Sequence, residues 1–202
     1  MISSSVVHVI DDDDAARESL AFLLGTAEFV FKTYESAKAF LDALPATNAG
    51  CVITDVRMPE IHGIELLRRL RSQGIGLPVI VITGHGDVPL AVEAMRAGAV
   101  DFIEKPYEGE LLLGAVRSAL SAQGAGATRE AERTDIQRRL AELSPRERQV
   151  LDGLVTGQPN KTIAYDLGIS ARTVEIYRAN LMTKMQASSL SHLVRMELIS
   201  AA

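Results

Sequence analysis

Short apolar runs alternate with helical spacing of apolar residues through the first 122 residues of the chain. Runs of branched aliphatic residues predict strands covered on both faces, and strands that alternate with helices predict a parallel sheet. The predicted strands are 6–10, 29–33 (the weakest), 52–54, 79–83 and 101–104, and the predicted helices are 14–26, 36–44, 63–73, 87–97 and 108–121. We therefore expect an α/β domain with a doubly wound, five-stranded parallel sheet over residues 1–122.

The pattern becomes wholly helical after residue 142. Ser144, Pro145 and Glu147 form a helix-start signal, in which the serine caps, the proline fits the first position and the glutamate closes a capping box. Four short helices are expected, at about 145–156, 160–168, 171–185 and 189–198. Because Gly168-Ile-Ser170 forms a tight turn between the second and third helices, we predict a small all-α four-helix domain with a helix-turn-helix over residues 143–202.

Residues 123–142 join the two modules. The segment begins with small residues and continues as a highly charged stretch, in which Ile136, Leu140 and Leu143 recur at helical spacing. This pattern predicts a partly helical, solvated linker. A dimerising coil is the alternative, although coiled coils need several heptads.

Composition and charge favour two modules with different partners. The chain has 202 residues, of which 47% are hydrophobic, and this excludes a disordered chain. A single cysteine excludes a disulfide within the chain and a cluster of thiolate metal ligands. Residues 1–122 carry a net charge of −7 and residues 123–202 a net charge of +2. Because no apolar run suits a signal peptide or a membrane span, we expect a soluble, cytoplasmic protein.

Acidic residues follow two of the predicted strands directly. Asp11 and Asp12 come after the strand at 6–10, and Asp55 comes after the strand at 52–54. The carboxyl ends of parallel strands meet at one edge of the sheet, where ligands bind. Carboxylates gathered there repel one another, and Mg²⁺ relieves this repulsion. Helix capping is the alternative role of Asp11 and Asp12, and the pattern leaves it open.

Two further polar residues end strands at the same predicted edge. Thr83 ends the strand at 79–83, and Lys105 follows the strand at 101–104. A hydroxyl, a lysine, a metal and several carboxylates together suit the binding of a phosphoryl group, with one carboxylate as the nucleophile.

These residues resemble the receiver domains of two-component response regulators. The resemblance covers residues 1–122, and the motifs that carry it are Asp11-Asp12, Asp55-Val-Arg-Met-Pro59, Thr83-Gly84 and Lys105-Pro106. It implies a flavodoxin-like fold and a histidine kinase that phosphorylates Asp55. It also implies a Mg²⁺ ion held by Asp12, Asp55 and the backbone carbonyl of Arg57, with Asp11 acting through water.

The resemblance also implies how phosphorylation is sensed. Thr83 and Lys105 would contact the phosphoryl group, and Phe102 would be an aromatic switch residue. The Lys105–Pro106 peptide bond is expected to be cis. The helix at 87–97, the strand that follows it and the helix at 108–121 would form a dimer surface after phosphorylation.

The third helix of the second module has the pattern of a DNA-recognition helix. Val174, Tyr177, Leu181 and Met185 are spaced to face the core, which leaves the opposite face for the DNA major groove. Lysine and arginine would meet phosphates, glutamate would accept from cytosine, and isoleucine and alanine would touch thymine methyl groups. The predicted DNA-contacting residues are Lys161, Arg172, Thr173, Glu175, Ile176, Arg178, Ala179 and Lys184. A helical hairpin with a solvated charged face is the alternative.

This second module is similar to the LuxR-type helix-turn-helix of the NarL/FixJ family. The motifs are Leu143-Ser-Pro-Arg-Glu-Arg-Gln-Val-Leu151, Asn160-Lys-Thr-Ile-Ala164, Leu167-Gly-Ile-Ser170 and Arg172-Thr-Val-Glu175. The resemblance implies a transcription activator that binds promoter DNA and RNA polymerase. The segments Thr83-Gly-His-Gly-Asp-Val-Pro89 and Lys161-Thr-Ile-Ala-Tyr-Asp166 are similar to members that activate nitrogen-fixation genes at low oxygen.

Two other classes of function compete with this interpretation. A Mg²⁺-dependent phosphatase with Asp55 as nucleophile would need a general acid, but position 57 holds Arg rather than Asp. We therefore expect no enzyme activity beyond slow self-dephosphorylation. An adaptor whose α-helical domain binds protein or RNA is the second rival, and the basic helix up to Lys184 favours duplex DNA instead.

Overall fold

The structure is a computed structural model that describes residues 5–44, 50–84, 88–121 and 126–201. Contacts between residues divide the chain into two compact units. The first consists of residues 1–86 and 97–124, and the second of residues 87–96 and 125–202. Each unit is described by itself below.

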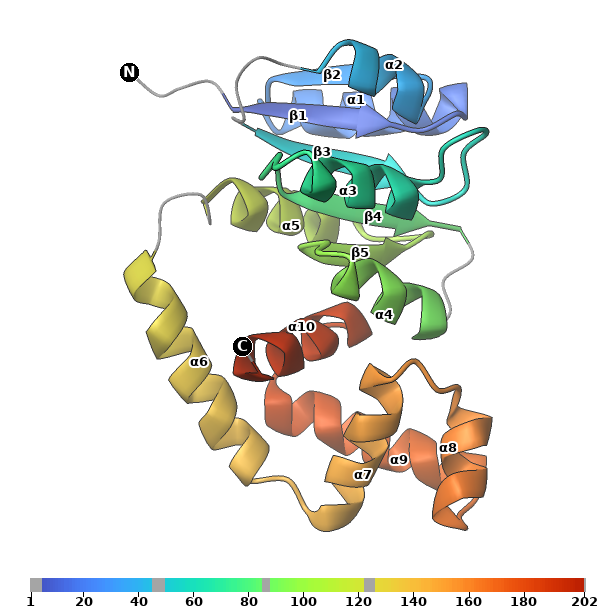
Figure 1. The fold of residues 1–202 in the computed structure, drawn as a ribbon, viewed down its shortest axis with the longest axis vertical. Helices are drawn as coiled ribbons and strands as arrows, with labels where there is room; N and C mark the ends of the chain where they lie inside the picture. The colour runs from blue at the N-terminus through green and yellow to red at the C-terminus, as the bar shows by residue number, and fades with distance from the viewer. Residues whose placement is uncertain (1–4, 45–49, 85–87, 122–125, 202) are drawn as a thin grey trace. The chain divides into compact units, whose positions relative to one another are not determined.

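The first unit contains a five-stranded sheet, as the sequence predicts. The strands are β1 (Val6–Ile10), β2 (Phe31–Tyr34), β3 (Gly50–Asp55), β4 (Val79–Thr83) and β5 (Asp101–Glu104). Their order is β2-β1-β3-β4-β5, and every pair of neighbours is parallel (Figure 1). The chain order therefore reverses at β1 and β3, and these central strands place their carboxyl ends at the edge where a doubly wound sheet binds ligands.

Helices cover the sheet because its residues are apolar on both faces. The helices of this unit are α1 (Asp14–Thr26), α2 (Ala37–Asp42), α3 (Gly63–Ser72) and α5 (Gly109–Ser121). Alternate strand residues, such as Val9, Ile53 and Ile82, form one core with Leu20 of α1 and Leu112 of α5. The contact-based division assigns α4 (Val88–Arg96) to the second unit.

The weakest predicted strand begins two residues later and ends one residue later than its sequence pattern indicates. Residues 29 and 30 belong to the connection after α1, because the backbone N–H of Phe29 donates to the carbonyl of Leu24 at the helix end. Glu28 adopts a left-handed conformation with φ of 60° in the same turn. The apolar pair Phe29–Val30 therefore leads into an edge strand, which pairs only with β1 within the described sheet.

The described residues of the second unit form five helices besides α4. They are α6 (Gly126–Ala141), α7 (Pro145–Val155), α8 (Asn160–Leu167), α9 (Ala171–Met185) and α10 (Leu190–Ala201). The predicted capping box at Ser144 and Glu147 is formed at the start of α7. Gly168 closes α8 with φ of 65°, and Ser170 caps α9, so the predicted helix-turn-helix is confirmed.

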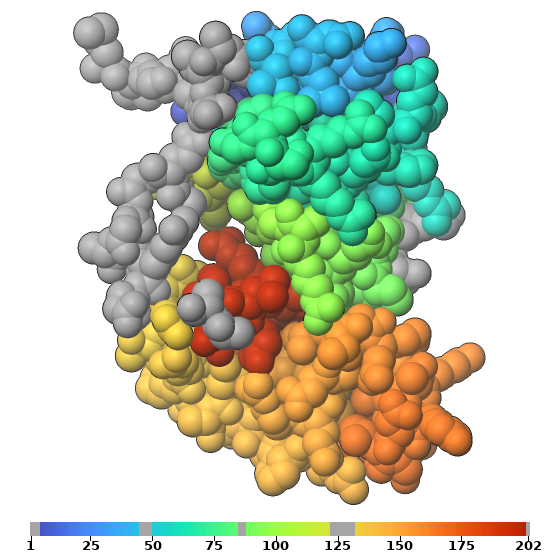
Figure 2. Space-filling view, viewed as in Figure 1, coloured from blue at the N-terminus to red at the C-terminus, as the bar shows by residue number. Residues whose placement is uncertain are grey.

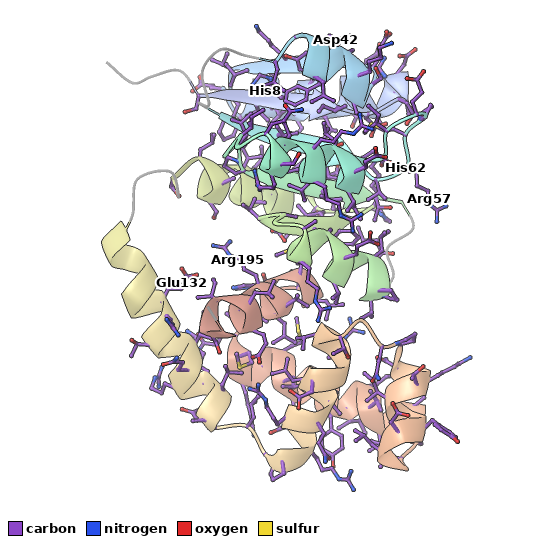
Figure 3. The ribbon with its side chains drawn as sticks, viewed as in Figure 1. His8, Asp42, Arg57, His62, Glu132 and Arg195 are labelled. Carbon is purple, nitrogen blue, oxygen red and sulfur yellow. The ribbon has the colours of Figure 1, made fainter. Side chains whose placement is uncertain are left out.

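The predicted linker helix α6 packs into the helical unit. Ile136 is 2% exposed within its core, and Leu140 and Leu143 pack against the same core. The guanidinium of Arg139 donates to the carbonyl of Met185 at 2.8 Å, and Glu132 pairs with Arg195 of α10 at 3.9 Å (Figure 3). The apolar stripe that suggested a solvated linker or a dimerising coil thus packs against its own chain, with Ile136 buried and Leu140 and Leu143 half-buried, and α6 is an additional helix beside the predicted four.

Among the described residues, no helix combines the length and the apolar character needed to cross a bilayer.

Candidate functional site

The strand register brings three of the predicted site residues to one face at one edge of the sheet. Ile10 pairs with Thr54, and Asp55 pairs with Ile82, so Asp11 follows its strand beside Asp55. Lys105 extends the β5 row of Ile103, whose partner is Ile82. Asp11, Asp55 and Lys105 therefore continue the rows of residues that form the core beneath α1 and α5.

Lys105 bridges the two carboxylates at this edge. Its ammonium donates to Asp11 Oδ2 at 2.9 Å and to Asp55 Oδ1 at 3.0 Å. Burial opposes the charge of Lys105, but the hydrogen bonds to Asp11 and Asp55 outweigh it and raise the pKa of the lysine. The side chains are 29%, 4% and 11% exposed for Lys105, Asp11 and Asp55, so Asp55 is partly open to a reactant while Asp11 is buried.

The loop after β3 holds the other oxygen of Asp55. The backbone N–H of Arg57 donates to Asp55 Oδ2 at 2.6 Å, whereas the Arg57 side chain is exposed and extends away from the sheet (Figure 3). The loop then folds back, and the N–H of Gly63 donates to the carbonyl of Val56 at 3.0 Å. Both carboxylate oxygens of Asp55 are therefore oriented by neighbours before any reactant binds.

The acidic loop after β1 is also held by hydrogen bonds. The N–H of Asp13 donates to Asp11 Oδ1 at 3.0 Å, and Asp13 itself caps α1 through the N–H of Ala16 at 2.9 Å. Asp12 lies between these two residues and is exposed. The capping role left open by the sequence thus falls to Asp13, while Asp11 faces Lys105.

The donor set fits a hard divalent cation in part. Asp11 and Asp55 supply carboxylate oxygens that lie within 3.0 Å of one ammonium, and the exposed Asp12 is the next residue in the chain after Asp11. Oxygen ligands of this kind, completed by water, are those that Mg²⁺ prefers. Among the described residues, however, no group of three His, Cys, Asp or Glu side chains is gathered as a metal site.

The predicted switch residues lie on the other face of the sheet. Thr83 ends β4 opposite Glu104, and Phe102 pairs with Val81, so Thr83 and Phe102 point to the same face. Thr83 is 1% exposed and Phe102 is 8% exposed. The Lys105–Pro106 peptide bond is cis, as expected. Residues 85–87 of the neighbouring loop, which include His85, lie outside the described part of the chain.

The helix α9 buries three of the four residues that its spacing predicts to face the core, and the fourth, Tyr177, is half-buried. Val174, Leu181 and Met185 are 0% exposed. Among the eight predicted DNA-contacting residues, Lys161, Arg172, Glu175, Ile176, Ala179 and Lys184 are exposed, while Thr173 and Arg178 are half-buried. Side chains near α8 project from the surface of this unit (Figure 2). The exposed set presents both charged and apolar groups, as a groove-reading surface requires.

Four of these residues already have partners within the chain. The hydroxyl of Thr173 bonds that of Ser170 at 2.8 Å, and Arg172 pairs with Glu175 at 3.4 Å. Lys184 donates to Glu147 Oε2 at 2.7 Å. A side chain engaged in this way is less available to a phosphate, so the structure gives Lys184 a second role that its spacing did not indicate.

Sequence patterns did not single out two residues that contact or stand near these sites. Arg17 of α1 donates to the backbone carbonyl of Asp11, and its distance of six residues from Asp11 fits no common motif. Tyr165 on α8 is 87% exposed, which makes it the most exposed large hydrophobic residue among those described. Its position four residues after Lys161, on the same side of a helix, was the available signal.

Comparisons with known proteins cover nearly the whole chain. The family model for the response regulator receiver domain matches residues 7–117, and the model for bacterial regulatory proteins of the luxR family matches residues 141–197. FixJ of Azorhizobium caulinodans is 57% identical over 99% of this chain and 95% of its own length. TodT of Pseudomonas putida is 41% identical over 95% of this chain and 85% of its own length.

Solved structures give the same result. The crystal structure of full-length FixJ from B. japonicum is 54% identical, covers 98% of this chain and 97% of its own, and has a TM-score of 0.58. The structure of the N-terminal part, FixJ-N, is 50% identical over 59% of this chain and 96% of its own, with a TM-score of 0.56.

Proposed function

Because this chain belongs to the family of FixJ-type two-component response regulators, we propose that a sensor histidine kinase switches it by phosphorylating Asp55. As a member of this family it has a sensor kinase as its partner, binds DNA and is a regulator rather than a classical enzyme. The observation that carries the proposal is the position of Lys105, whose ammonium lies 3.0 Å from Asp55 Oδ1 and 2.9 Å from Asp11 Oδ2.

The proposed reaction is an in-line displacement at phosphorus. A carboxylate oxygen of Asp55 attacks the phosphorus of a phosphohistidine, so that an O–P bond forms while the P–N bond of the donor breaks. The histidine leaves with the bonding electron pair and takes a proton from solvent. Because the second oxygen of Asp55 accepts from the N–H of Arg57, the carboxylate keeps one orientation for the incoming group.

The neighbouring groups stabilise the phosphoryl group once it is transferred. Lys105 exchanges Asp55 for a phosphoryl oxygen while keeping its bond to Asp11. Asp11, Asp12, Asp55 and the carbonyl of Arg57 would hold Mg²⁺, which supplies positive charge for the phosphoryl oxygens when it is bound. Water reaches the acyl phosphate through the exposed side of Asp55, which accounts for slow self-dephosphorylation.

The switch would pass through the sheet to its other face. Thr83 ends β4, next to the strand that carries Asp55, and we propose that its hydroxyl moves toward a phosphoryl oxygen on Asp55. Phe102 lies on the same face and fills the space that Thr83 leaves when it moves. Through Thr83 and Phe102, phosphorylation of Asp55 would change the surface of the receiver. We propose that the protein responds by forming a homodimer.

The DNA-binding domain would carry the output. Lys161 and Arg172 are proposed to contact phosphates, and Glu175, Ile176 and Ala179 to contact bases. By the similarity to FixJ proteins we propose nitrogen-fixation genes as targets and contact with RNA polymerase as the means of activation. We propose residues 1–122 as the receiver and residues 143–202 as the DNA-binding domain, joined by residues 123–142, whose helix α6 packs with the latter.

The phosphorylation step is tested by mass spectrometry. The intact protein is incubated with acetyl phosphate and Mg²⁺, and wild type is expected to gain one phosphoryl group. The variant Asp55→Asn is nearly isosteric but cannot form the acyl phosphate, so it is expected to gain none. A phosphoryl group retained by this variant would show that the acceptor lies elsewhere.

The output is tested by footprinting on genomic fragments with and without acetyl phosphate. Wild type is expected to protect a discrete site more strongly after phosphorylation, and Asp55→Asn is the matched control that stays at the weak level. Equal protection by both proteins under both conditions would contradict control of DNA binding by Asp55.

A further inference from the structure

Arg17 is bound to the acidic loop beside the phosphorylation site. The residue lies on α1, and its side chain is only 15% exposed despite its charge. Its Nη1 donates to the backbone carbonyl of Asp11 at 2.7 Å, and its Nη2 pairs with Asp14. A guanidinium is suited to such a double contact because its donors lie in one rigid plane.

The carbonyl of Asp11 needs this donor because β1 has ended. The N–H of Asp11 still donates to the carbonyl of Tyr34 on β2, at 3.3 Å. Its carbonyl is bonded instead by Arg17, which belongs to the helix that follows the loop. The Arg17 side chain thus connects the end of β1 to the first turns of α1, in addition to the backbone of the loop.

The side-chain carboxylate of Asp11 is also held, at both of its oxygens. Asp11 Oδ1 accepts from the N–H of Asp13, and Asp11 Oδ2 accepts from Lys105. The backbone carbonyl of Asp13 in turn accepts from the N–H of Arg17 at 3.0 Å. Asp12 lies between Asp11, whose carbonyl accepts from the Arg17 side chain, and Asp13, whose carbonyl accepts the first helical bond from the Arg17 backbone.

From this geometry we propose that Arg17 is a positioning residue for the acidic loop, which sets Asp11 and Asp12 for a divalent cation. The inference rests on the proposed function, because it assigns Arg17 to the same site. Arg17 would act through the backbone carbonyl of Asp11, which its guanidinium contacts, rather than as a ligand of the cation. Neighbours of metal ligands typically change metal affinity by 10- to 100-fold when they are removed.

Positioning by Arg17 and the charge of Arg17 would have opposite effects on Mg²⁺ binding. Arg17 is a cation close to a run of acidic residues, Asp11–Asp14. If it acted only through its charge, removing it would strengthen the attraction of the loop for Mg²⁺. If it acts by positioning, removing it weakens Mg²⁺ binding. The sign of the change therefore separates the two effects.

The test measures Mg²⁺ binding to the full chain by isothermal titration calorimetry, without a phosphodonor. Arg17→Met keeps the aliphatic stem and removes the guanidinium, and it is expected to weaken Mg²⁺ binding roughly 10-fold. Unchanged or tighter binding overturns the proposal. Asp14→Asn is the matched control: it removes the exposed ion pair but leaves the bond to Asp11, and it is expected to change the affinity by about threefold at most.

A second variant keeps the test decisive if Arg17→Met does not fold. Arg17→Lys preserves the charge, but a single ammonium cannot reach both the Asp11 carbonyl and Asp14. It is expected to bind Mg²⁺ more weakly than wild type, and wild-type affinity in this variant overturns the proposal. If wild type itself binds no Mg²⁺, the proposed metal site is wrong. If wild type and both Arg17 variants bind alike, only the role of Arg17 is wrong.

Discussion

Gly63 stands against the backbone of the proposed phosphoacceptor. A Cβ atom at this position would lie 2.1 Å from the carbonyl oxygen of Asp55 and 3.1 Å from the hydroxyl of Thr54. No side chain can rotate away to relieve the first contact, because the oxygen belongs to the strand. The absence of a side chain at residue 63 is therefore what lets α3 begin directly beside the site.

We predict that Gly63→Ala destabilises the receiver by about 1–3 kcal/mol and slows phosphorylation by acetyl phosphate, since Asp55 must shift to make room. Urea denaturation and a phosphorylation time course measure the two effects. Gly76→Ala is the control, because its Cβ would meet open space. If Gly63→Ala and Gly76→Ala phosphorylate at the same rate, the close approach does not set the geometry of Asp55.

The site residues that could be predicted from the sequence are those whose side-chain type and position at a strand end indicate their chemistry. Asp55 ends its strand, and Asp11 and Lys105 directly follow theirs. Strand ends were predictable from apolar runs, so the meeting of these residues at one edge was predictable too. Arg17 and Gly63 work through the backbone of another residue. Such contacts depend on how a loop folds back, and no periodicity of the sequence encodes that.

The start of α7 and the end of α9 are held together by one buried carboxylate. Glu147 is 4% exposed, and its Oε2 accepts from the N–H of Ser144 at 2.8 Å and from Lys184 at 2.7 Å. The hydrogen bond from Lys184, followed by the bond from Ser144, outweighs burial and lowers the pKa of Glu147. This carboxylate therefore fixes one end of the recognition helix.

We predict that Glu147→Gln destabilises the DNA-binding domain by about 1–3 kcal/mol near neutral pH. Because the pKa of Glu147 is lowered on folding, its contribution is complete above the unfolded value of about 4.3 and is lost as the pH falls through the folded value. The difference between wild type and variant should therefore shrink below about pH 4.3. Denaturant titrations over a range of pH measure this difference.

A double-mutant cycle with Lys184→Met supplies the control. The sum of the two single losses in the free energy of unfolding should exceed the loss in the double variant by about 0.5–3 kcal/mol, because either change alone removes the same bond. An alternative outcome supports the phosphate contact that the sequence suggested. In that case Lys184→Met would leave stability unchanged and lower the salt dependence of DNA binding by about one unit.

Element boundaries were predictable where one physical signal dominated. β1 and β4 begin and end as their apolar runs indicate, and α9 follows its cap at Ser170. β2 was displaced because an apolar pair before it belongs to a turn. The packing of α6 was missed because its apolar stripe is thin, and burial of Ile136 depends on partners far along the chain.

The dimer surface implied by the family calls for a probe that is exposed in this structure. Val92 on α4 is 3% exposed, so an acidic residue there would test folding rather than association. Leu111 on α5 belongs to the same implied surface and is 44% exposed. Phe22 on α1 is 76% exposed and lies outside that surface, so it serves as a matched control.

We predict that phosphorylated wild type sediments as a dimer, whereas Leu111→Asp stays monomeric and still accepts phosphate. Dimerisation makes binding to the second DNA half-site intramolecular and can raise apparent affinity by roughly 10²–10⁴. Leu111→Asp should lose that gain, and Phe22→Asp should keep it. A phosphorylated Leu111→Asp protein that dimerises as wild type does would exclude α5 from the interface.

The two hydrogen bonds of Lys105, to Asp11 and Asp55, affect how the stability of the protein depends on magnesium. In many small metalloproteins the ion supplies the free energy of folding, so depletion destroys the protein. Here the buried carboxylate of Asp11 already has a partner within the chain, the ammonium of Lys105 at 2.9 Å, which offsets part of the acidic charge of the pocket. Newly made chains should therefore accumulate in folded form whatever the supply of the ion. The cellular magnesium concentration would then set the extent of phosphorylation without changing the amount of folded protein.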